Sequence, residues 1–268
     1  MSGTPVVFIH GLWLHASSWQ PWITRFEQAG YAAQAPGWPG DRAGVEATRA
    51  AASDLAGVSI DDITSHYAEL IGRLDAAPIV VGHSFGGLIA QKLLAAGHAR
   101  AAVAIDPAGF KGVKPLPLSQ LRSVLPVLRN PANRNRAVSL TAAQFRYGFG
   151  NAIEKSESDA LFAQYTIPGP GKILFQGASA NFSSKSEAAV DTRSAARGPL
   201  LLIAGGADHT VPEVVVKAAA KLYEGSGART DLKTFPGRGH SLVIDHGWSD
   251  VADSALSWVQ ALAPAARA

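Results

Sequence analysis

Six short apolar segments alternate with segments of helical periodicity, and this alternation constrains the fold more than any other feature of the chain. The apolar segments begin at residues 5, 31, 78, 101, 199 and 229. Each is short and bounded by turn residues, which is typical of a buried strand. Strands that alternate with helices form a parallel sheet covered by helices on both faces. The sequence therefore predicts an α/β fold built on a mostly parallel, doubly wound sheet.

The segments between these strands carry apolar residues at helical spacing. Trp19, Trp22, Ile23 and Phe26 fall at i, i+3, i+4 and i+7, which places them on one face of a helix. Further helices are expected after Ser59, which can act as an N-cap, and over 85–96, 212–225 and 251–262. Gly30 and Gly97 can end helices because glycine adopts the left-handed backbone conformation at no steric cost.

One gap between strands is too long to hold a single helix. It covers residues 107–198 and is rich in Pro, Arg, Asn and Ser, yet it also has apolar residues at helical spacing around Leu121 and Leu125. We expect residues 1–106 and 199–268 to form the core of the fold. We expect residues 107–198 to form a partly helical cap, or lid, over the sheet.

Ser84 lies in the segment Gly82-His83-Ser84-Phe85-Gly86, which fits the pattern G-x-S-x-G. The pattern alone is weak, but here an expected strand precedes it and an expected helix follows it. That context is the sharp strand-to-helix turn that exposes a nucleophilic serine. Glycines relieve crowding at such a turn, and the N-terminus of the helix favours developing negative charge. The sequence therefore predicts that Ser84 is a nucleophile; the alternative is a glycine-rich turn with an ordinary serine.

A serine nucleophile needs a general base that can reach it from the carboxyl edge of the sheet. His240 follows the last expected strand in a glycine-containing loop, which is where open α/β sheets place their ligands. His83 is adjacent to the serine in sequence, and His66 and His98 lie in or beside expected helices. We therefore expect His240 to be the base, with His246 as the fallback.

Two aspartates are candidates for the acid that orients this histidine. Asp208 follows the strand directly before the one that leads to His240, and consecutive units tend to be neighbours. Asp106 ends an earlier strand and precedes Pro107, which restricts it to extended backbone conformations. We expect Asp208 to be the acid. Its alternative role is that of a residue capping the following helix.

Acyl transfer also requires two preorganised N–H donors for the oxyanion. The residue after the nucleophile, Phe85, is expected to supply one donor. The loop after the first strand, His10-Gly11-Leu12, is expected to supply the other through the N–H of Leu12.

The order Ser84, Asp208, His240 is the order of the α/β-hydrolase triad, and the chain resembles that superfamily over nearly its whole length. It is most similar to the branch of serine esterases, lipases and cofactor-free haloperoxidases. The stretch from His10 to Trp19 also resembles the start of plant methylesterases and hydroxynitrile lyases, and within it Trp13 and His15 are the expected substrate-binding residues.

The chain departs from this superfamily in one respect. Members often have two strands before the histidine-glycine loop, so the resemblance implies a sheet trimmed at one edge. The dehalogenases and epoxide hydrolases of this superfamily have an aspartate at the strand-to-helix turn, here called the elbow. Because this chain has Ser84 there, both activities are disfavoured.

The sequence thus predicts a serine hydrolase that cleaves a small to medium carboxylic ester through an acyl-enzyme on Ser84. A lactone or amide hydrolase is the nearest alternative, and a lyase of the hydroxynitrile type could use the same triad. A ligand-binding protein on a hydrolase scaffold is the alternative outside enzymes. The expected partner is a small-molecule ester, and the sequence says nothing about the oligomeric state.

Composition excludes several other classes of protein. A net charge of +3 is too weak to indicate a nucleic-acid partner. The chain has no cysteine, no evident metal cluster and no dinucleotide fingerprint, so neither cofactor nor metal is expected. No signal peptide or 18-residue apolar span is visible, so a cytoplasmic protein is expected. Residues 107–153 carry seven Lys and Arg and no Asp or Glu, which indicates either a solvated outer face or attraction of an anionic substrate.

Overall fold

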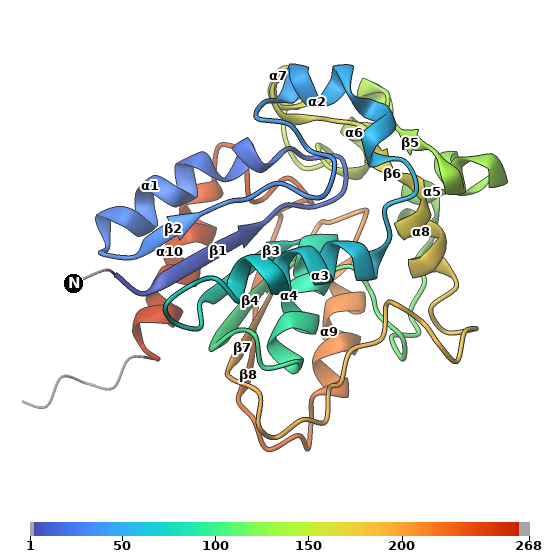
Figure 1. Ribbon diagram of the computed structural model, residues 1–268. Helices are drawn as coiled ribbons and strands as arrows, with labels where there is room; N and C mark the ends of the chain where they lie inside the picture. The colour runs from blue at the N-terminus through green and yellow to red at the C-terminus, as the bar shows by residue number, and fades with distance from the viewer. Residues whose placement is uncertain (1–2, 263–268) are drawn as a thin grey trace, which may run out of the picture.

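The central sheet is parallel throughout, whereas the sequence predicts a mostly parallel one. The computed structural model describes residues 3–262, drawn in colour in Figure 1. The strands of the sheet are β1 (Pro5–Ile9), β2 (Ala32–Gln34), β3 (Ile79–His83), β4 (Ala101–Ile105), β7 (Leu200–Gly205) and β8 (Thr230–Phe235). Their order across the sheet is β2-β1-β3-β4-β7-β8, and every neighbouring pair is parallel. Each strand begins within one residue of its expected start.

Helices cover both faces of this sheet. They are α1 (Gln20–Gln28), α3 (Ile60–Ile71), α4 (Phe85–Ala95), α9 (Glu213–Leu222) and α10 (Trp248–Gln260). A further short helix, α2 (Val45–Ala50), lies beside α7 (Lys155–Tyr165) of the segment between β4 and β7, where Arg49 donates to the carbonyls of Ala163 and Thr166 (Figure 1). Right-handed crossovers place α3, α4 and α9 on one face, and α1 lies beside α10 on the other (Figure 1). Within residues 3–262, no helix has the length and apolar character needed to cross a membrane.

Local signals in the sequence set the ends of several helices. The side chain of Ser59 accepts a hydrogen bond from the N–H of Asp62 at 3.1 Å, and the Asp62 carboxylate accepts one from the N–H of Ser59 at 2.9 Å. This capping box confirms the expected start of α3. Gly30 and Gly97 have φ of +89° and +80°, which confirms both expected glycine stops.

A cluster of aromatic rings fixes α1 against the sheet. Phe8 of β1 packs on Trp19, Trp22 and Phe26, with ring centroids 5.1, 6.1 and 5.2 Å away. Trp22 also contacts Trp248 at the start of α10, with centroids 6.4 Å apart. Burial of such large rings contributes strongly to the core, so the helical face read from the sequence joins β1, α1 and α10.

The segment between β4 and β7 is partly helical, which confirms the expected character of this insertion. It contains α5 (Leu118–Leu128), α6 (Ala142–Gly148), α7 (Lys155–Tyr165) and α8 (Gly171–Ala178). Two short strands, β5 (Ala137–Val138) and β6 (Gly169–Pro170), pair antiparallel. A 3₁₀ turn, η3 (Pro131–Asn135), also lies in this segment. Within residues 3–262, two further 3₁₀ turns, η1 (Ala16–Trp19) and η2 (Ala52–Leu55), lie earlier in the chain, before α1 and α3. Figure 1 shows the four helices of the insertion beyond the carboxyl ends of the strands.

Candidate active site

Ser84 stands at the turn between β3 and α4. Its backbone has φ +54° and ψ −120°, a conformation that costs free energy in a residue with a side chain. The turn is held because the N–H of Ser84 donates to the carbonyl of Ile105 at 2.9 Å, and its own carbonyl accepts from Ala108 and Leu88. The strained elbow expected from the sequence is therefore present.

Close packing of the backbone leaves no room for a side chain at the two glycines that flank the serine. A Cβ at Gly82 would lie 2.0 Å from the carbonyl oxygen of Gly86, and a Cβ at Gly86 would lie 2.2 Å from that of Ile9. Both contacts involve backbone, which cannot move aside easily. The glycines thus allow β1, β3 and α4 to approach closely behind Ser84.

His240 lies in the loop after β8 and is fully buried. Its Nε2 is 3.0 Å from Ser84 Oγ, which is hydrogen-bonding distance for proton transfer. His246, the fallback, is exposed and pairs with Glu157 at 2.9 Å. The structure brings His240 to the serine and places His246 elsewhere.

Asp208 holds the other side of the His240 ring. Its Oδ2 is 2.5 Å from His240 Nδ1, so Nδ1–H donates to the carboxylate and Nε2 is left to face the serine. Its Oδ1 accepts from the backbone N–H groups of Thr210 and Val211 at 2.6 and 2.9 Å. One oxygen therefore caps the turn before α9, and the other contacts the histidine. The alternative role was wrong, because Pro212 is the N-cap of α9 and no side chain in the described part of the chain caps that helix.

Asp106 does not adopt the extended backbone that its position before proline predicts. Its φ is +40°, in the left-handed region, so that expectation was wrong. Hydrogen bonds on both sides outweigh the steric preference: its N–H donates to Ile203 at 2.8 Å, and its Oδ1 accepts from Gly205 N–H at 2.6 Å. The side chain is consequently directed into the site rather than toward the cap.

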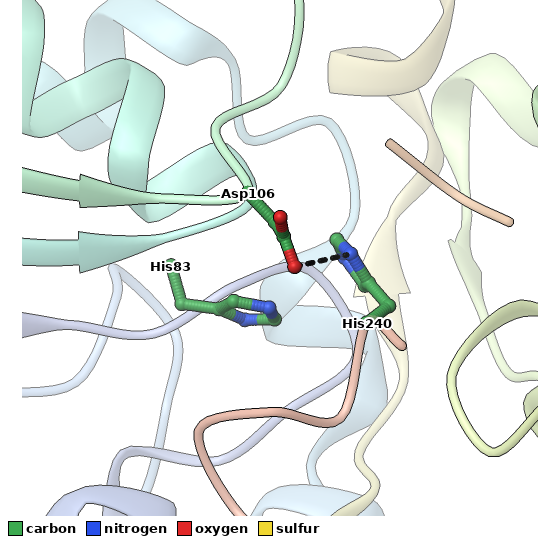
Figure 2. Close-up of side chains that lie close together, drawn as sticks. All are labelled: His83, Asp106 and His240. Carbon is green, nitrogen blue, oxygen red and sulfur yellow. Dashed lines mark ion pairs between the residues drawn. The ribbon is translucent and has the colours of Figure 1, made fainter. Parts of the chain in front are cut away.

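Figure 2 shows Asp106 between His83 and His240. Asp106 Oδ2 is 4.0 Å from His240 Nδ1, compared with 2.5 Å for Asp208. Complete burial, followed by the charge of the neighbouring Asp208 carboxylate, raises the pKa of Asp106 well above its ordinary range. Two buried carboxyl groups that interact cannot both ionise freely, and the raised pKa of Asp106 favours its protonated form.

His83 is a fully buried neighbour of the histidine base. Its ring centroid is 4.5 Å from that of His240. Burial, and secondarily the nearby His240, holds the pKa of His83 well below its usual range, so its ring is neutral. A neutral ring adds no charge that would compete with Asp208 for His240.

His83, Asp106 and His240 together have the chemistry of a metal site, which the sequence did not suggest. Their ligating atoms lie within 4.8 Å of one another. However, both ring nitrogens of His240 already have partners, Asp208 and Ser84. We therefore interpret this cluster as the surroundings of His240 and propose no metal there.

Leu12 and Phe85, the expected oxyanion donors, border the same cavity as Ser84. The loop that carries Leu12 touches the elbow, since a Cβ at Gly11 would lie 2.9 Å from the Cβ of Ser84. In residues 3–262, neither the N–H of Leu12 nor that of Phe85 donates to a protein acceptor. Both amides are free to bind an oxyanion.

The two expected substrate-binding residues differ in their positions. Trp13 borders the cavity, and its indole N–H donates to the carbonyl of Val138 at 2.9 Å, which ties the β1 loop to the insertion. His15 is buried away from the cavity, with ring nitrogens 2.8 Å from Ser17 Oγ and 3.0 Å from the carbonyl of Arg42. The structure does not bring His15 to the site, because its ring caps the turn after β1.

A cavity of about 280 Å³ opens above Ser84. Most of its lining is apolar and comes from the insertion as well as from the core. The insertion contributes Phe110, Val113, Leu116, Leu121, Val124, Leu128, Phe149 and Leu174. Lys114 is the one charged residue among those that line it in the described part of the chain. Such a cavity suits an uncharged, largely apolar ligand.

Phe149 is a site residue that sequence reasoning missed. It is buried, lines the cavity and packs edge-on against His240, with ring centroids 4.7 Å apart. Its carbonyl also accepts from the N–H of Ser241 at 3.2 Å. The clustered aromatic residues at positions 145, 147 and 149 were a signal of this role, although nothing in the sequence indicated which ring would reach the histidine.

The parallel sheet, together with the buried arrangement of Ser84, His240 and Asp208, is typical of α/β hydrolases. Residues 6–254 match the family model of the alpha/beta hydrolase family. The chain therefore belongs to the alpha/beta hydrolase family. Comparison of the sequence with curated proteins gives no significant match.

Solved structures share this fold at low sequence identity. A putative non-heme bromoperoxidase from Mycobacterium tuberculosis has a TM-score of 0.72 and 20% identity, with 98% of this chain and 94% of that chain covered. A monoacylglycerol lipase from Paleococcus ferrophilus gives 0.62 and 20%, covering 97% and 96%. A methylesterase from Arabidopsis gives 0.67 and 15%, covering 97% and 100%.

Proposed function

We propose that this protein is a serine hydrolase that cleaves carboxylic esters through an acyl-enzyme on Ser84. The observation that carries the proposal is the continuous chain of contacts from Ser84 Oγ to His240 Nε2 at 3.0 Å and from His240 Nδ1 to Asp208 Oδ2 at 2.5 Å. These are the distances that nucleophilic catalysis by a hydroxyl requires. The monoacylglycerol lipase and the methylesterase named above are consistent with such chemistry.

The first half of the reaction forms the acyl-enzyme. Ser84 Oγ attacks the ester carbonyl while His240 Nε2 accepts the hydroxyl proton. The carbonyl oxygen becomes an oxyanion, which the N–H groups of Leu12 and Phe85 stabilise. His240 then donates the proton to the leaving alkoxide, and the C–O bond of the ester breaks to release the alcohol.

The second half repeats these roles with water as the nucleophile. His240 accepts a proton from water, the hydroxide attacks the acyl carbon, and the proton returns to Ser84 Oγ as the acid leaves. Asp208 accepts the Nδ1–H hydrogen bond throughout and stabilises the imidazolium. Because Asp208 Oδ1 is fixed by the amides of Thr210 and Val211, the imidazole is held in one orientation.

Residues 107–198 act as the cap in this proposal, and they supply much of the apolar lining above the serine. Trp13 is assigned to substrate binding because it borders the cavity beside the oxyanion loop. The apolar lining favours an uncharged ester with an apolar acyl or alcohol group.

The test is a fluorophosphonate probe combined with a panel of nitrophenyl esters of graded acyl length. The probe is expected to label Ser84 in the unmodified protein and not in Ser84→Ala. Ester hydrolysis by Ser84→Ala is expected to fall by about 10⁴-fold or more. Hydrolysis of lactones or amides with no ester hydrolysis would redirect the substrate assignment. Cleavage of a cyanohydrin alone would make the protein a lyase.

A further inference from the structure

Exposed apolar side chains gather at one place on the surface. In residues 3–262, seven large apolar side chains are exposed. Three of them, Leu116, Leu121 and Phe182, also line the cavity, and two more lie on α5 with Leu121, which makes a group of five. We call these five the mouth surface: Leu116 (66% exposed), Leu118 (83%), Leu121, Leu125 and Phe182 (90%). The other two, Val214 and Leu232, lie in α9 and β8. Contiguous apolar surface of this kind usually marks an interaction site.

Three of these leucines share one side of α5. At 3.6 residues per turn, Leu118, Leu121 and Leu125 fall on one stripe of the helix. Arg122 and Arg129 fall on the same side, next to the leucines, and both are exposed. The outer face of α5 thus combines apolar side chains with cationic ones, which is the pattern of a helix that lies in a lipid–water interface.

The mouth surface is continuous with the cavity. Leu116, Leu121 and Phe182 are exposed to solvent and also line the cavity above Ser84. An apolar molecule could therefore pass from a hydrocarbon phase into the cavity without crossing water. This continuity distinguishes a lipid surface from a protein partner, because a protein seated here would close the opening.

The charge around the opening fits an anionic surface. Residues 107–153 contain no Asp or Glu, and Lys114, which lines the cavity, is exposed. Lys185, near Phe182 in sequence, is also exposed. The guanidinium of Arg122 lies 4.3 Å from the ring of Tyr147, which holds it beside the leucines. Basic side chains placed at such a surface are each attracted by anionic headgroups.

We propose that the mouth surface docks on an anionic lipid surface, with the axis of α5 in the plane of the headgroups. The leucines and Phe182 enter the acyl boundary, and Arg122 and Arg129 contact lipid phosphates. Docking places the opening of the cavity against the lipid, so an apolar ligand reaches the cavity directly. This property does not depend on the ester chemistry proposed above.

The experiment measures co-sedimentation of the full chain with vesicles of diether phosphatidylcholine, with and without diether phosphatidylglycerol. Diether lipids contain no ester that the protein could cleave. The protein is expected to bind the vesicles that contain phosphatidylglycerol, and Leu118→Ser/Leu125→Ser is expected to weaken binding by about tenfold or more. Neither residue lines the cavity, so hydrolysis of a dissolved ester measured in parallel is expected to be unchanged.

Two further variants serve as controls. Val214→Ser/Leu232→Ser removes the same kind of exposed apolar side chain elsewhere and is expected to bind as the unmodified protein does. Arg122→Gln/Arg129→Gln is expected to lose about fivefold per arginine on the anionic vesicles and little on the neutral ones.

Several results would overturn the inference. They are absence of vesicle binding by the unmodified protein, equal binding by the leucine variant, or a dimer in sedimentation velocity that the leucine substitutions abolish while no vesicles bind. Vesicle binding without ester cleavage would contradict only the proposed function.

Discussion

Replacing each of two neighbouring aspartates by asparagine distinguishes the acid that orients His240 from the one beside it. Asp208 Oδ2 accepts the Nδ1–H of His240 at 2.5 Å, whereas Asp106 Oδ2 is 4.0 Å away. In Asp208→Asn, an amide nitrogen at this position would favour the wrong imidazole tautomer and remove the charge that stabilises the imidazolium. The expected loss in kcat/KM is about 10⁴-fold, which corresponds to about 5 kcal/mol of transition-state stabilisation.

Asp106→Asn is expected to be mild. An asparagine can still accept the Gly205 N–H through its oxygen. Its amide nitrogen would replace Asp106 Oδ2, a buried oxygen that has no hydrogen-bond partner in the described part of the chain. A change within about tenfold is therefore expected, since no hydrogen bond of the site is lost.

Both variants would be assayed on the best nitrophenyl ester at saturating and limiting concentrations, after thermal unfolding shows that each is folded. The two substitutions have the same shape, but only Asp208→Asn removes a negative charge, because the raised pKa of Asp106 favours its protonated form. A large loss of kcat/KM in Asp106→Asn, with only a small loss in Asp208→Asn, would reverse the assignment of the acid. Equal and small losses in both would remove the charge-stabilisation argument altogether.

Three further outcomes are expected. Gly86→Ala is expected to destabilise the fold by about 2 kcal/mol or more and lower activity, because the new Cβ would meet the Ile9 carbonyl at 2.2 Å; an unchanged midpoint in urea would contradict this. Because the pKa of Asp106 is raised, the folded protein keeps a proton that the unfolded chain releases above about pH 4, so Asp106 costs stability as pH rises from there toward its folded pKa. Asp106→Asn is therefore expected to gain more in Tm over the unmodified protein at pH 8 than at pH 4, and a constant difference between the two Tm values would refute the raised pKa. Val124→Trp, which fills the cavity, is expected to lower kcat/KM for long-chain nitrophenyl esters by about tenfold or more while sparing the acetate; equal effects on both esters would place the acyl group elsewhere.

The central strands of the sheet were readable from the sequence because they are buried on both faces, unlike the edge strands β2 and β8. Strands β3 and β4 consist wholly of buried residues, and apart from Gly82 and His83 at the end of β3 they appear in the sequence as apolar segments. Helix α3 was equally clear, since Ser59 and Asp62 form a local capping box. Such signals involve only residues close together in the chain, so they can be recognised without knowledge of the tertiary structure.

The surroundings of His240 were not readable, because they arise from contacts between distant segments. The preference of Asp106 for extended backbone was overridden by hydrogen bonds to Ile203 and Gly205, almost a hundred residues away in the chain. The position of His15 after the first strand suggested that it binds substrate. Its ring instead caps the following turn by accepting from the N–H of Ser17, so it does not reach the cavity. Which ring would face which carboxylate depends on the packing of β4, β7 and β8 together.

The distribution of Ser84, Asp208 and His240 along the chain has a consequence for how the protein acquires its site during folding. The serine belongs to the first third of the sequence, whereas the histidine follows β8, an edge strand of the sheet that pairs only with β7. Closing this contact brings together residues 156 positions apart, and contacts of such long sequence separation form late because loop-closure entropy opposes them. A nascent chain would have its elbow built before the base and acid existed to activate it. The hydroxyl of Ser84 is therefore not activated as a nucleophile until β8 has joined the sheet.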